Sequence, residues 1–440
     1  MGRPKGAGTY GGGTIFALDA GLLPPPSVSP FAPLSGTVGQ QVLVWGRSLL
    51  GATSISSMGW RPRMCTRFPT RVNVSACRRS LTRLVVRFGG SAIQNHAPKA
   101  KALASNRAGG SLVKAAVVPA VSSSWQIRDV PQPQPGPNQV LVKMHASGIC
   151  YTDVHLTLGH FPGAFPRILG HEPVGEIVAV APDVTMRQVG DRVGTAWIQS
   201  TCGRCEWCRR GRRMFCPYMK GTGVDVPGGH AEYMLMNADA TFLIPDKVPY
   251  EQAAPIFCAG YTVYSGLRWA DPKPHERVAV LGIGGLGHLA VQYAKAAGFE
   301  TIAVSRSPDK DKMIRDLGAD EIVRDGKSLA AAGGADVILS TSNSTKSMVD
   351  SIQGLRPDGR LVAMGADVEP LSISLTDLIM KRIRVIGSQQ NGPEYLYEAL
   401  DFVARGKVKT IVETYPLAEA PKAYERVVEG KARFRAVLTM

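Results

Sequence analysis

The sequence predicts an α/β protein with two folded parts, one rich in β-strands and one built on a doubly wound parallel sheet. The first observation is a series of short apolar, strand-like runs, separated by irregular loops, between residues 112 and 262. The second is an alternation of buried strands and helical segments between residues 277 and 390. The third is a glycine-rich turn at residues 282–287, which lies between a predicted strand and a predicted helix.

Residues 1–111 differ in composition from the rest of the chain and are left out of the predicted fold. They hold 14 Lys and Arg and a single acid, Asp19, for a net charge of +13, whereas the whole 440-residue chain carries +16. We expect a basic, low-complexity, disordered extension. It is either a mitochondrial-type transit segment or the result of a start placed upstream of the true initiator. The protein is predicted to be cytoplasmic, or mitochondrial (matrix) if the segment is a transit peptide.

The remaining residues argue against two classes of partner. Residues 112–440 hold 37 bases and 34 acids, a net charge of +3, which does not predict binding to nucleic acid. No apolar run approaches the roughly 18 residues that a membrane-spanning helix needs. Of the eight cysteines, Cys65 and Cys77 lie in the extension and the other six form two groups with metal-like spacing. This usage favours zinc in a reducing compartment over a disulfide framework.

The first folded part begins near Ser111. Residues 112–118 and 125–130 are predicted to form paired strands, and a proline-rich connector precedes the strand that starts at Val140. The pair Gly190 and Asp191 marks a turn into another strand. This half is therefore predicted to be β-rich, with irregular loops.

Side chains suited to metal binding and proton transfer lie close together in the 23 residues from Cys150 to Glu172, namely Cys150, Thr152, Asp153, His155, His171 and Glu172. Thiolate and neutral imidazole are ligands that zinc prefers, so Cys150 and His171 are candidate ligands. A third ligand is required, and Cys258 is the remaining thiol outside the extension that belongs to no other group. Cys150, His171 and Cys258 are therefore predicted to hold a zinc ion with an open fourth position.

Four further cysteines follow the pattern C-x2-C-x2-C-x7-C, at Cys202, Cys205, Cys208 and Cys216. Four thiolates at this spacing can close a tetrahedron around zinc, so the lobe at residues 200–217 is predicted to be structural. A nucleic-acid-binding zinc module is the alternative, although no helix-borne base-reading pattern follows. If the lobe is structural, the five arginines between the cysteines form a solvated face: Arg204, Arg209, Arg210, Arg212 and Arg213.

The second folded part is organised around a nucleotide-binding turn. A short buried strand at residues 278–281 precedes the turn, and a helix with periodic apolar residues follows from Leu289. Glycines between them let the backbone approach a pyrophosphate at the helix N-terminus: Gly282, Gly284, Gly285 and Gly287. Further strands are predicted at residues 301–305, 336–339, 360–364 and 383–386. After residue 390 we expect an amphipathic helix, a strand near Ile411, a helix near Pro421 and a final strand at residues 436–439.

The residues after the second strand of this sheet predict the cofactor. An NAD site usually has a carboxylate about 20 residues past the glycines, which holds the ribose 2′-hydroxyl. This chain has Ser305, Arg306 and Ser307 there, followed by Lys310. Hydroxyls and a guanidinium accept a 2′-phosphate through charge-assisted hydrogen bonds, so NADP(H) is predicted in preference to NAD. The alternative is that Arg306 faces solvent and the site is indifferent.

From about residue 112 to 440, these motifs together resemble zinc-dependent medium-chain alcohol dehydrogenases, and most of all the NADP-linked aldehyde reductase and cinnamyl-alcohol dehydrogenase branch. The motifs at residues 258–262 and 432–435 add to the likeness. The resemblance implies a split GroES-like catalytic domain, residues 112–262 with a return at 391–440, around a Rossmann domain at 263–390. It also implies an active site in the cleft between the domains, and a homodimer or homotetramer. With the two cysteine groups, two zinc ions per chain are expected, one catalytic and one structural.

The resemblance also implies roles for residues around the predicted catalytic zinc, which would act as a Lewis acid while a hydride moves to or from nicotinamide. Thr152 and His155 are a predicted proton relay to solvent, with a merely capped turn as the alternative. Asp153 is expected to orient His171 through the other ring nitrogen. Glu172 is expected to exchange as a transient ligand.

Four residues further from the zinc complete the predicted site. Trp197 is expected to line the substrate pocket and to favour bulky or aromatic aldehydes, unless it only packs the core. The resemblance implies that Thr262 contacts the carboxamide or ribose side of the cofactor and that Arg435 contacts the pyrophosphate. His230 stands where such proteins usually carry Tyr or Phe, and it is interpreted as a loop or core histidine and not as a ligand.

The predicted function is therefore that of a zinc-dependent NADP(H) alcohol dehydrogenase or aldehyde reductase acting on small primary alcohols and aldehydes. An NAD(P)-dependent polyol or secondary-alcohol dehydrogenase is the first alternative. A zinc-bearing nucleic-acid-binding protein that uses the basic extension is a remote one.

Overall fold

A computed structural model describes residues 111–161, 163–365, 367 and 369–440, together with six backbone strands between residues 16 and 87. The chain divides into two units, residues 1–107 and 108–440. In the first unit, β1 (Phe16–Asp19) pairs with β4 (Ser54–Ser57). A second sheet there has the order β2 (Ser27–Val28), β3 (Gln41–Arg47), β6 (Arg83–Arg87) and β5 (Asn73–Ala76). The predictions for Cys65, Cys77 and the nature of this extension lie outside the described residues.

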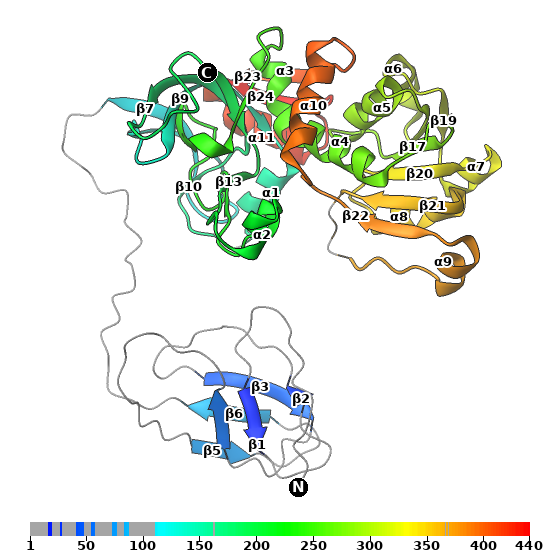
Figure 1. The fold of residues 1–440 in the computed structure, drawn as a ribbon, viewed down its shortest axis with the longest axis horizontal. Coiled ribbons are helices and arrows are strands. Elements are labelled where there is room, and N and C mark those ends of the chain that lie inside the picture. Colours follow the sequence, from blue (N-terminus) through cyan, green and yellow to red (C-terminus); the bar gives the residue numbers. More distant parts are fainter. Residues whose placement is uncertain are drawn as a thin grey trace. The chain divides into compact units, whose positions relative to one another are not determined.

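The β-rich part of the second unit contains three antiparallel or mixed sheets (Figure 1). The first has the order β10 (Arg167–Ile168), β7 (Leu112–Val118) and β8 (Gln126–Pro131). The largest runs β16 (Thr241–Leu243), β12 (Arg192–Thr195), β11 (Glu172–Val180), β9 (Gln139–Ile149), β24 (Arg435–Thr439) and β23 (Val412–Pro416), and β15 (Tyr233–Asn237) also pairs with β9. A small pair, β13 (Ile198–Ser200) and β14 (Lys220–Gly221), flanks the four-cysteine lobe.

The second part contains a six-stranded parallel sheet. Its order is β19 (Glu321–Val323), β18 (Glu300–Val304), β17 (Arg277–Leu281), β20 (Ala335–Ser340), β21 (Leu355–Ala363) and β22 (Arg384–Gly387). Alternate residues of β17 face opposite cores, because Val278 and Val280 pack in one apolar cluster whereas Ala279 and Leu281 pack in another. Helices therefore cover both faces, as Figure 1 shows, and the predicted doubly wound α/β fold is confirmed.

Helices connect and cover these sheets. In the parallel part they are α4 (Ala259–Ala270), α5 (Gly287–Ala296), α6 (Asp311–Asp316), α7 (Gly326–Ala331), α8 (Thr345–Ser351), α9 (Leu375–Lys381) and α10 (Pro393–Ala404). In the β-rich part they are α1 (Tyr151–Thr157), α2 (Glu206–Arg209), α3 (Tyr250–Ala253) and α11 (Ala420–Val428). Within the described part of the chain, no helix combines the length and apolar character that crossing a bilayer requires.

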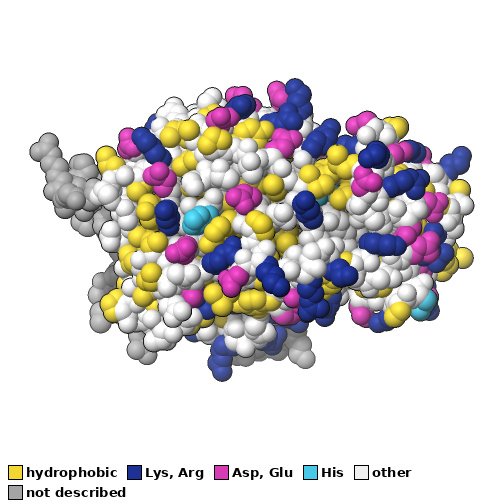
Figure 2. Space-filling model, turned by 90° about the horizontal axis from the view of Figure 1, so that it is seen from above, with side chains coloured by type: hydrophobic (Ala, Val, Ile, Leu, Met, Phe, Trp, Pro, Cys, Tyr) yellow, Lys and Arg dark blue, Asp and Glu magenta, His cyan; other side chains and the backbone are white. Residues whose placement is uncertain are grey.

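The chain returns from the parallel sheet to the β-rich part at its C-terminal end. There β24 inserts between β9 and β23, antiparallel to β9 and parallel to β23. The split architecture expected of the catalytic domain is thus present. Basic and acidic side chains lie interspersed over most of the face drawn in Figure 2, in keeping with the small net charge of residues 112–440.

Candidate active site and zinc centres

Three distant segments bring Cys150, His171 and Cys258 together with Glu172. Their ligand atoms all lie within 4.8 Å of one another. Cys150 is the N-cap of α1, His171 immediately precedes β11, and Cys258 immediately precedes α4. The two sulfurs are 3.9 Å apart. Zinc–sulfur bonds of about 2.3 Å in a tetrahedron would place two sulfurs about 3.8 Å apart, so the donor set fits one shared zinc ion.

The imidazole of His171 has a ring nitrogen free to bind a metal ion. Both of its ring nitrogens are buried and make no hydrogen bond to any described residue. Nδ1 lies 3.7 Å from Oδ1 of Asp153, which leaves Nε2 for an ion. Asp153 is itself fully buried and accepts the Cys150 backbone N–H at 2.8 Å. Burial alone would lower the pKa of His171, but Asp153 and Cys150 outweigh it and raise that pKa well above its usual range.

A buried ion pair lies directly behind these ligands. Arg435 donates from Nη2 to Oε1 of Glu172, and both side chains are almost fully buried. Burial alone would lower the pKa of Arg435, but Glu172 and Cys150 raise it, so the guanidinium stays charged. A Cβ at Gly148 on β9 would lie 1.9 Å from the other carboxylate oxygen of Glu172, so glycine is required for this close approach.

Arg435 also links the ligand group to the glycine turn. A Cβ at Gly285 would lie 2.9 Å from Nη1 of Arg435. Gly282 has a positive φ of +87°, and a Cβ at Gly287 would lie 1.9 Å from the Gly282 carbonyl oxygen. A Cβ at Gly284, in contrast, would meet no atom within 4 Å. The turn is therefore tight on one side and open on the other, which suits a pyrophosphate at the N-terminus of α5.

A cavity of about 200 Å³ opens beside this turn, at the carboxyl ends of the parallel strands. All four residues predicted to choose the cofactor line it: Ser305, Arg306, Ser307 and Lys310. Sequence reasoning missed other polar lining residues, namely Arg324, Asp325, Ser342, Ser347 and Asp350. Arg324 and Asp325 directly follow β19, and that position at the end of a parallel strand is the signal that could have identified them.

The cationic groups of this cavity differ in their partners. Arg324 forms a two-pronged ion pair with Asp311, at 2.8 and 2.5 Å. Lys310 donates from Nζ to the carbonyl oxygen of Ile283 at 3.3 Å. Burial lowers the pKa of Lys310, and Arg433 lowers it further. No ion pair joins Arg306 to an acid within the described ranges, so its guanidinium is available to a bound anion.

The two residues of the predicted relay lie on one face of α1. Thr152 and His155 are three positions apart, which places them side by side on a helix. The hydroxyl of Thr152 is 3.7 Å from the sulfur of Cys150. His155 Nδ1 lies 3.0 Å from Nδ1 of His160, an exposed residue that sequence reasoning missed. Burial lowers the pKa of His155, and the neighbouring His160 lowers it further.

Three further residues named from the sequence, Trp197, Thr262 and His230, lie next to His171, Cys258 and Asp153 respectively. The indole of Trp197 meets the ring of His171 edge-on, with centroids 5.5 Å apart and planes at 77°. Thr262 lies in the first turn of α4, and its backbone N–H donates to the carbonyl of Cys258 at 2.9 Å. His230 is fully buried near Asp153, as a core histidine would be.

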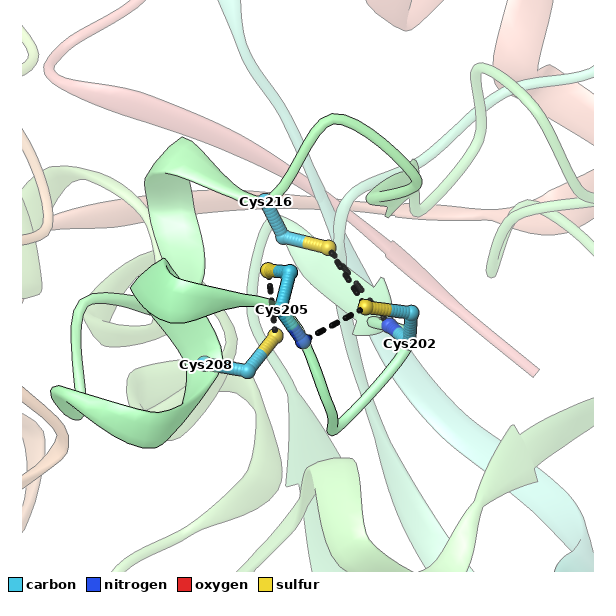
Figure 3. A group of neighbouring side chains, drawn as sticks. All are labelled: Cys202, Cys205, Cys208 and Cys216. Carbon is cyan, nitrogen blue, oxygen red and sulfur yellow. Dashed lines mark hydrogen bonds between the residues drawn. The ribbon is translucent and has the colours of Figure 1, made fainter. Parts of the chain in front are cut away.

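The four cysteines of the lobe also converge, as Figure 3 shows. Their closest sulfur pairs are 3.5 Å (Cys205 and Cys208) and 3.7 Å (Cys202 and Cys216) apart. These spacings are close to the edge of about 3.8 Å expected for a zinc tetrahedron. Two of the intervening arginines are paired with acids, Arg210 with Glu206 and Arg213 with Asp239.

Two parts of the chain match known family models, and the chain has relatives among known proteins. Residues 136–246 match the alcohol dehydrogenase GroES-like domain, and residues 285–405 match the zinc-binding dehydrogenase domain. An alcohol dehydrogenase of Geobacillus stearothermophilus is 40% identical over 334 residues, which are 74% of this chain and 99% of the relative. One from Moraxella sp. (strain TAE123) is 40% identical over 335 residues, with the same coverage of both chains.

Solved structures show the same likeness. A cinnamyl alcohol dehydrogenase from Sorghum bicolor superposes with a TM-score of 0.70 at 30% identity and covers 75% of this chain and 98% of its own. An acetophenone reductase from Geotrichum candidum, solved with NAD, gives 0.67 at 29% identity, covering 75% and 97%. The CAD from Helicobacter pylori, complexed with NADP(H), gives 0.67 at 26% identity, covering 75% and 98%.

Proposed function

Because the chain belongs to the zinc-dependent medium-chain alcohol dehydrogenase family, we propose that it is an NADP-preferring enzyme that interconverts primary alcohols and aldehydes. The observation that carries this proposal is the convergence of Cys150, His171 and Cys258 within one coordination distance, joined through Arg435 to the glycine turn. A zinc ion held by these three residues would supply Lewis acidity toward the oxygen of an alcohol or carbonyl group.

Residues of the chain would bind the cofactor, transfer the proton and orient His171. The glycine turn and Arg435 would hold the pyrophosphate, because both present donors or positive charge to it. Thr152 would pass a proton to His155, and His155 would exchange it with solvent, since its ring is half-buried and burial lowers its pKa, which favours the base form of the ring. Asp153 would keep His171 oriented through Nδ1.

The NADP preference is supported by the cavity next to the glycine turn. Ser305, Arg306, Ser307 and Lys310 offer two hydroxyls and two cations there, and the lining acids are already engaged with backbone N–H groups. Asp350 accepts from Gly326 N, and Asp325 accepts from Ser328 N. Similar solved structures hold either NAD or NADP(H), so the comparison does not choose between the two cofactors. The proposed preference for NADP(H) therefore depends on these residues of the chain.

The substrate preference is supported by Trp197. Its indole stands against the ring of His171, so a substrate oxygen at the metal would place its carbon chain near an aromatic wall. We therefore favour aromatic or bulky aldehydes as substrates. One similar structure is named for cinnamyl alcohol and another for acetophenone, a ketone, and a substrate panel can separate these two classes.

Assembly into a homodimer or homotetramer is supported by an apolar edge of the parallel sheet. Leu375, Ile379 and Met380 on α9 are 73%, 70% and 76% exposed. The adjacent strand β22 pairs with β21 on one side and with no other described strand. An unpaired edge beside exposed apolar side chains is a surface that a second copy of the chain could cover.

The test is NADPH consumption by the purified protein with aromatic aldehydes, aliphatic aldehydes, ketones and sugars. We expect aromatic aldehydes to give the highest kcat/KM, and a maximum with ketones or sugars would contradict the proposed class. Cys150→Ser should reduce turnover to background and lower the zinc content from about two ions per chain to about one, while the fold is kept. Near-wild-type turnover of this variant would overturn the assignment of the site.

A further inference from the structure

His230 is a buried imidazole that the proposed reaction does not use. It lies just before β15, fully enclosed, with its ring 5.2 Å from that of Trp125. Its backbone is fixed on two sides, because its N–H donates to the carbonyl of Leu169 at 3.1 Å and its carbonyl accepts from Ala116 N at 2.8 Å. The backbone of His230 is therefore held in place, and its side chain is fully buried.

One nitrogen has a partner, and the other is aimed at a carboxylate. Nδ1 lies 2.9 Å from the hydroxyl oxygen of Ser147 on β9. Nε2 makes no hydrogen bond to a described residue and lies 4.0 Å from Oδ1 of Asp153. If the Ser147 hydroxyl donates to Nδ1, the proton of a neutral ring sits on Nε2 and points toward Asp153. Burial lowers the pKa of His230 to about 4, so the ring is neutral near pH 7.

Asp153 is the residue through which this ring can act on the metal ligands. One of its oxygens accepts the Cys150 backbone N–H at 2.8 Å. The other accepts the Gly170 backbone N–H at 3.2 Å and faces His171 Nδ1 at 3.7 Å. The ring of His230 also packs against Gly170, where a Cβ would lie 2.6 Å from Nδ1, and Gly170 precedes His171 directly.

We propose that His230 is a positioning residue for the catalytic metal, whose Nε2 faces Asp153 across 4.0 Å and, by its charge complementarity with that carboxylate, holds the group that orients His171. Ser147, His230, Asp153 and His171 then form one line from β9 to the ion. This proposal rests on the proposed zinc ligands. Its test measures metal retention, so it can fail or succeed independently of the enzyme's reaction.

Two substitutions distinguish the effect of the N–H group of His230 from the effect of its ring on packing. His230→Phe keeps an aromatic ring of similar volume but removes both nitrogens. His230→Gln offers an amide N–H close to the place of Nε2. We expect His230→Phe to release one of the two zinc ions to a dipicolinate chelator about 10-fold faster than the wild type, since outer partners of metal ligands typically change metal affinity by about 10- to 100-fold. His230→Gln should restore release to within about twofold of the wild type.

The zinc of the four-cysteine lobe is the internal control, because its release rate should be the same in all variants. Replacing zinc with cobalt gives a second readout, as His230→Phe should shift the visible absorption of the Cys150 site alone. Unchanged release and an unchanged spectrum for His230→Phe would overturn the proposal. Equal acceleration of both zinc ions, or equal defects in His230→Phe and His230→Gln, would show a packing role instead. Should His230→Phe fail to fold, Ser147→Ala decides, and wild-type metal release by that variant overturns the proposal.

Discussion

At the residue scale, His155 is the residue that we propose passes a proton between the site and solvent. It is half-buried, with Nδ1 3.0 Å from the exposed His160, and both burial and that neighbour lower its pKa below the usual 6.5. The base form of His155 therefore persists to a lower pH than that of a free imidazole. Alcohol oxidation by the wild type should lose rate only as the pH falls through this lowered pKa.

His155→Ala should slow alcohol oxidation near pH 7 by about 10- to 100-fold, because relay by a positioned base contributes about that much or more. The rate should recover in part at alkaline pH, where hydroxide can take the proton. The pH profile of kcat checks this expectation. His145→Ala, which removes a ring that stacks on Tyr250, is the matched control. A defect of equal size at every pH would exclude a relay.

Arg306 is the second residue whose role can be measured directly. Arg306→Glu places a carboxylate in the cavity next to the glycine turn, where a 2′-phosphate would be repelled. Loss of one charge-assisted hydrogen bond costs about 1.5–3 kcal/mol, so KM for NADPH should rise about 10- to 100-fold while KM for NADH changes little. Arg315→Glu, on the exposed side of α6, controls for the change in net charge. An unchanged ratio of the two KM values would remove Arg306 from the cofactor site.

Individual ligands could be predicted from the sequence, whereas their supporting contacts could not. Ligand chemistry and spacing nominate Cys150, His171 and Cys258. The Glu172–Arg435 ion pair spans 263 positions, and no local pattern indicates that it forms. The contact of His230 with Asp153 depends on the pairing of β15 with β9, which is a tertiary feature.

At the scale of elements, the four-cysteine lobe can be tested without an assay of the enzyme. Its five arginines are trypsin sites held in a loop that the thiolates close. Cys208→Ser should remove about one zinc ion per chain and make the lobe the first site of tryptic cleavage, because a structural zinc supplies local folding energy. Cys150→Ser should lose the other zinc and leave the lobe resistant. Equal cleavage of both variants would contradict a structural role for the lobe.

Elements were predictable where burial is continuous. Strands β17, β18 and β20 are buried on both faces and contain long apolar runs, so their predicted limits agree with the structure within one residue at each end. Strand β22 also lies within one residue of its predicted limits, although it is mostly exposed. The strand β21 instead begins at Leu355, five residues before its predicted start, because the turn-like residues 356–359 hide its first half. Two- and three-residue strands such as β10 and β13 arise from tertiary pairing and leave no sequence period.

At the scale of the whole molecule, the exposed apolar side chains of α9 predict the assembly state. Ile379→Lys would place a charge in the proposed contact between two copies, where its burial is unfavourable. Light scattering should then give the mass of one chain for the variant and at least two for the wild type. Val189→Lys, at an exposed apolar residue elsewhere, should leave the mass unchanged. A wild type with the mass of one chain would refute the assembly.

The position of β24 has a consequence for synthesis on the ribosome. The parallel sheet is drawn from residues 277–387 and can fold as soon as that stretch has emerged, since domains generally fold as units during translation. The sheet that contains β9, the strand directly before Cys150, cannot be completed at that stage. Its strand β9 pairs with β24, which is synthesised more than 280 residues later. The nascent enzyme would therefore pass through a stage in which the nucleotide half is native and the metal half is open, and chaperones or metal donors would meet it in that form.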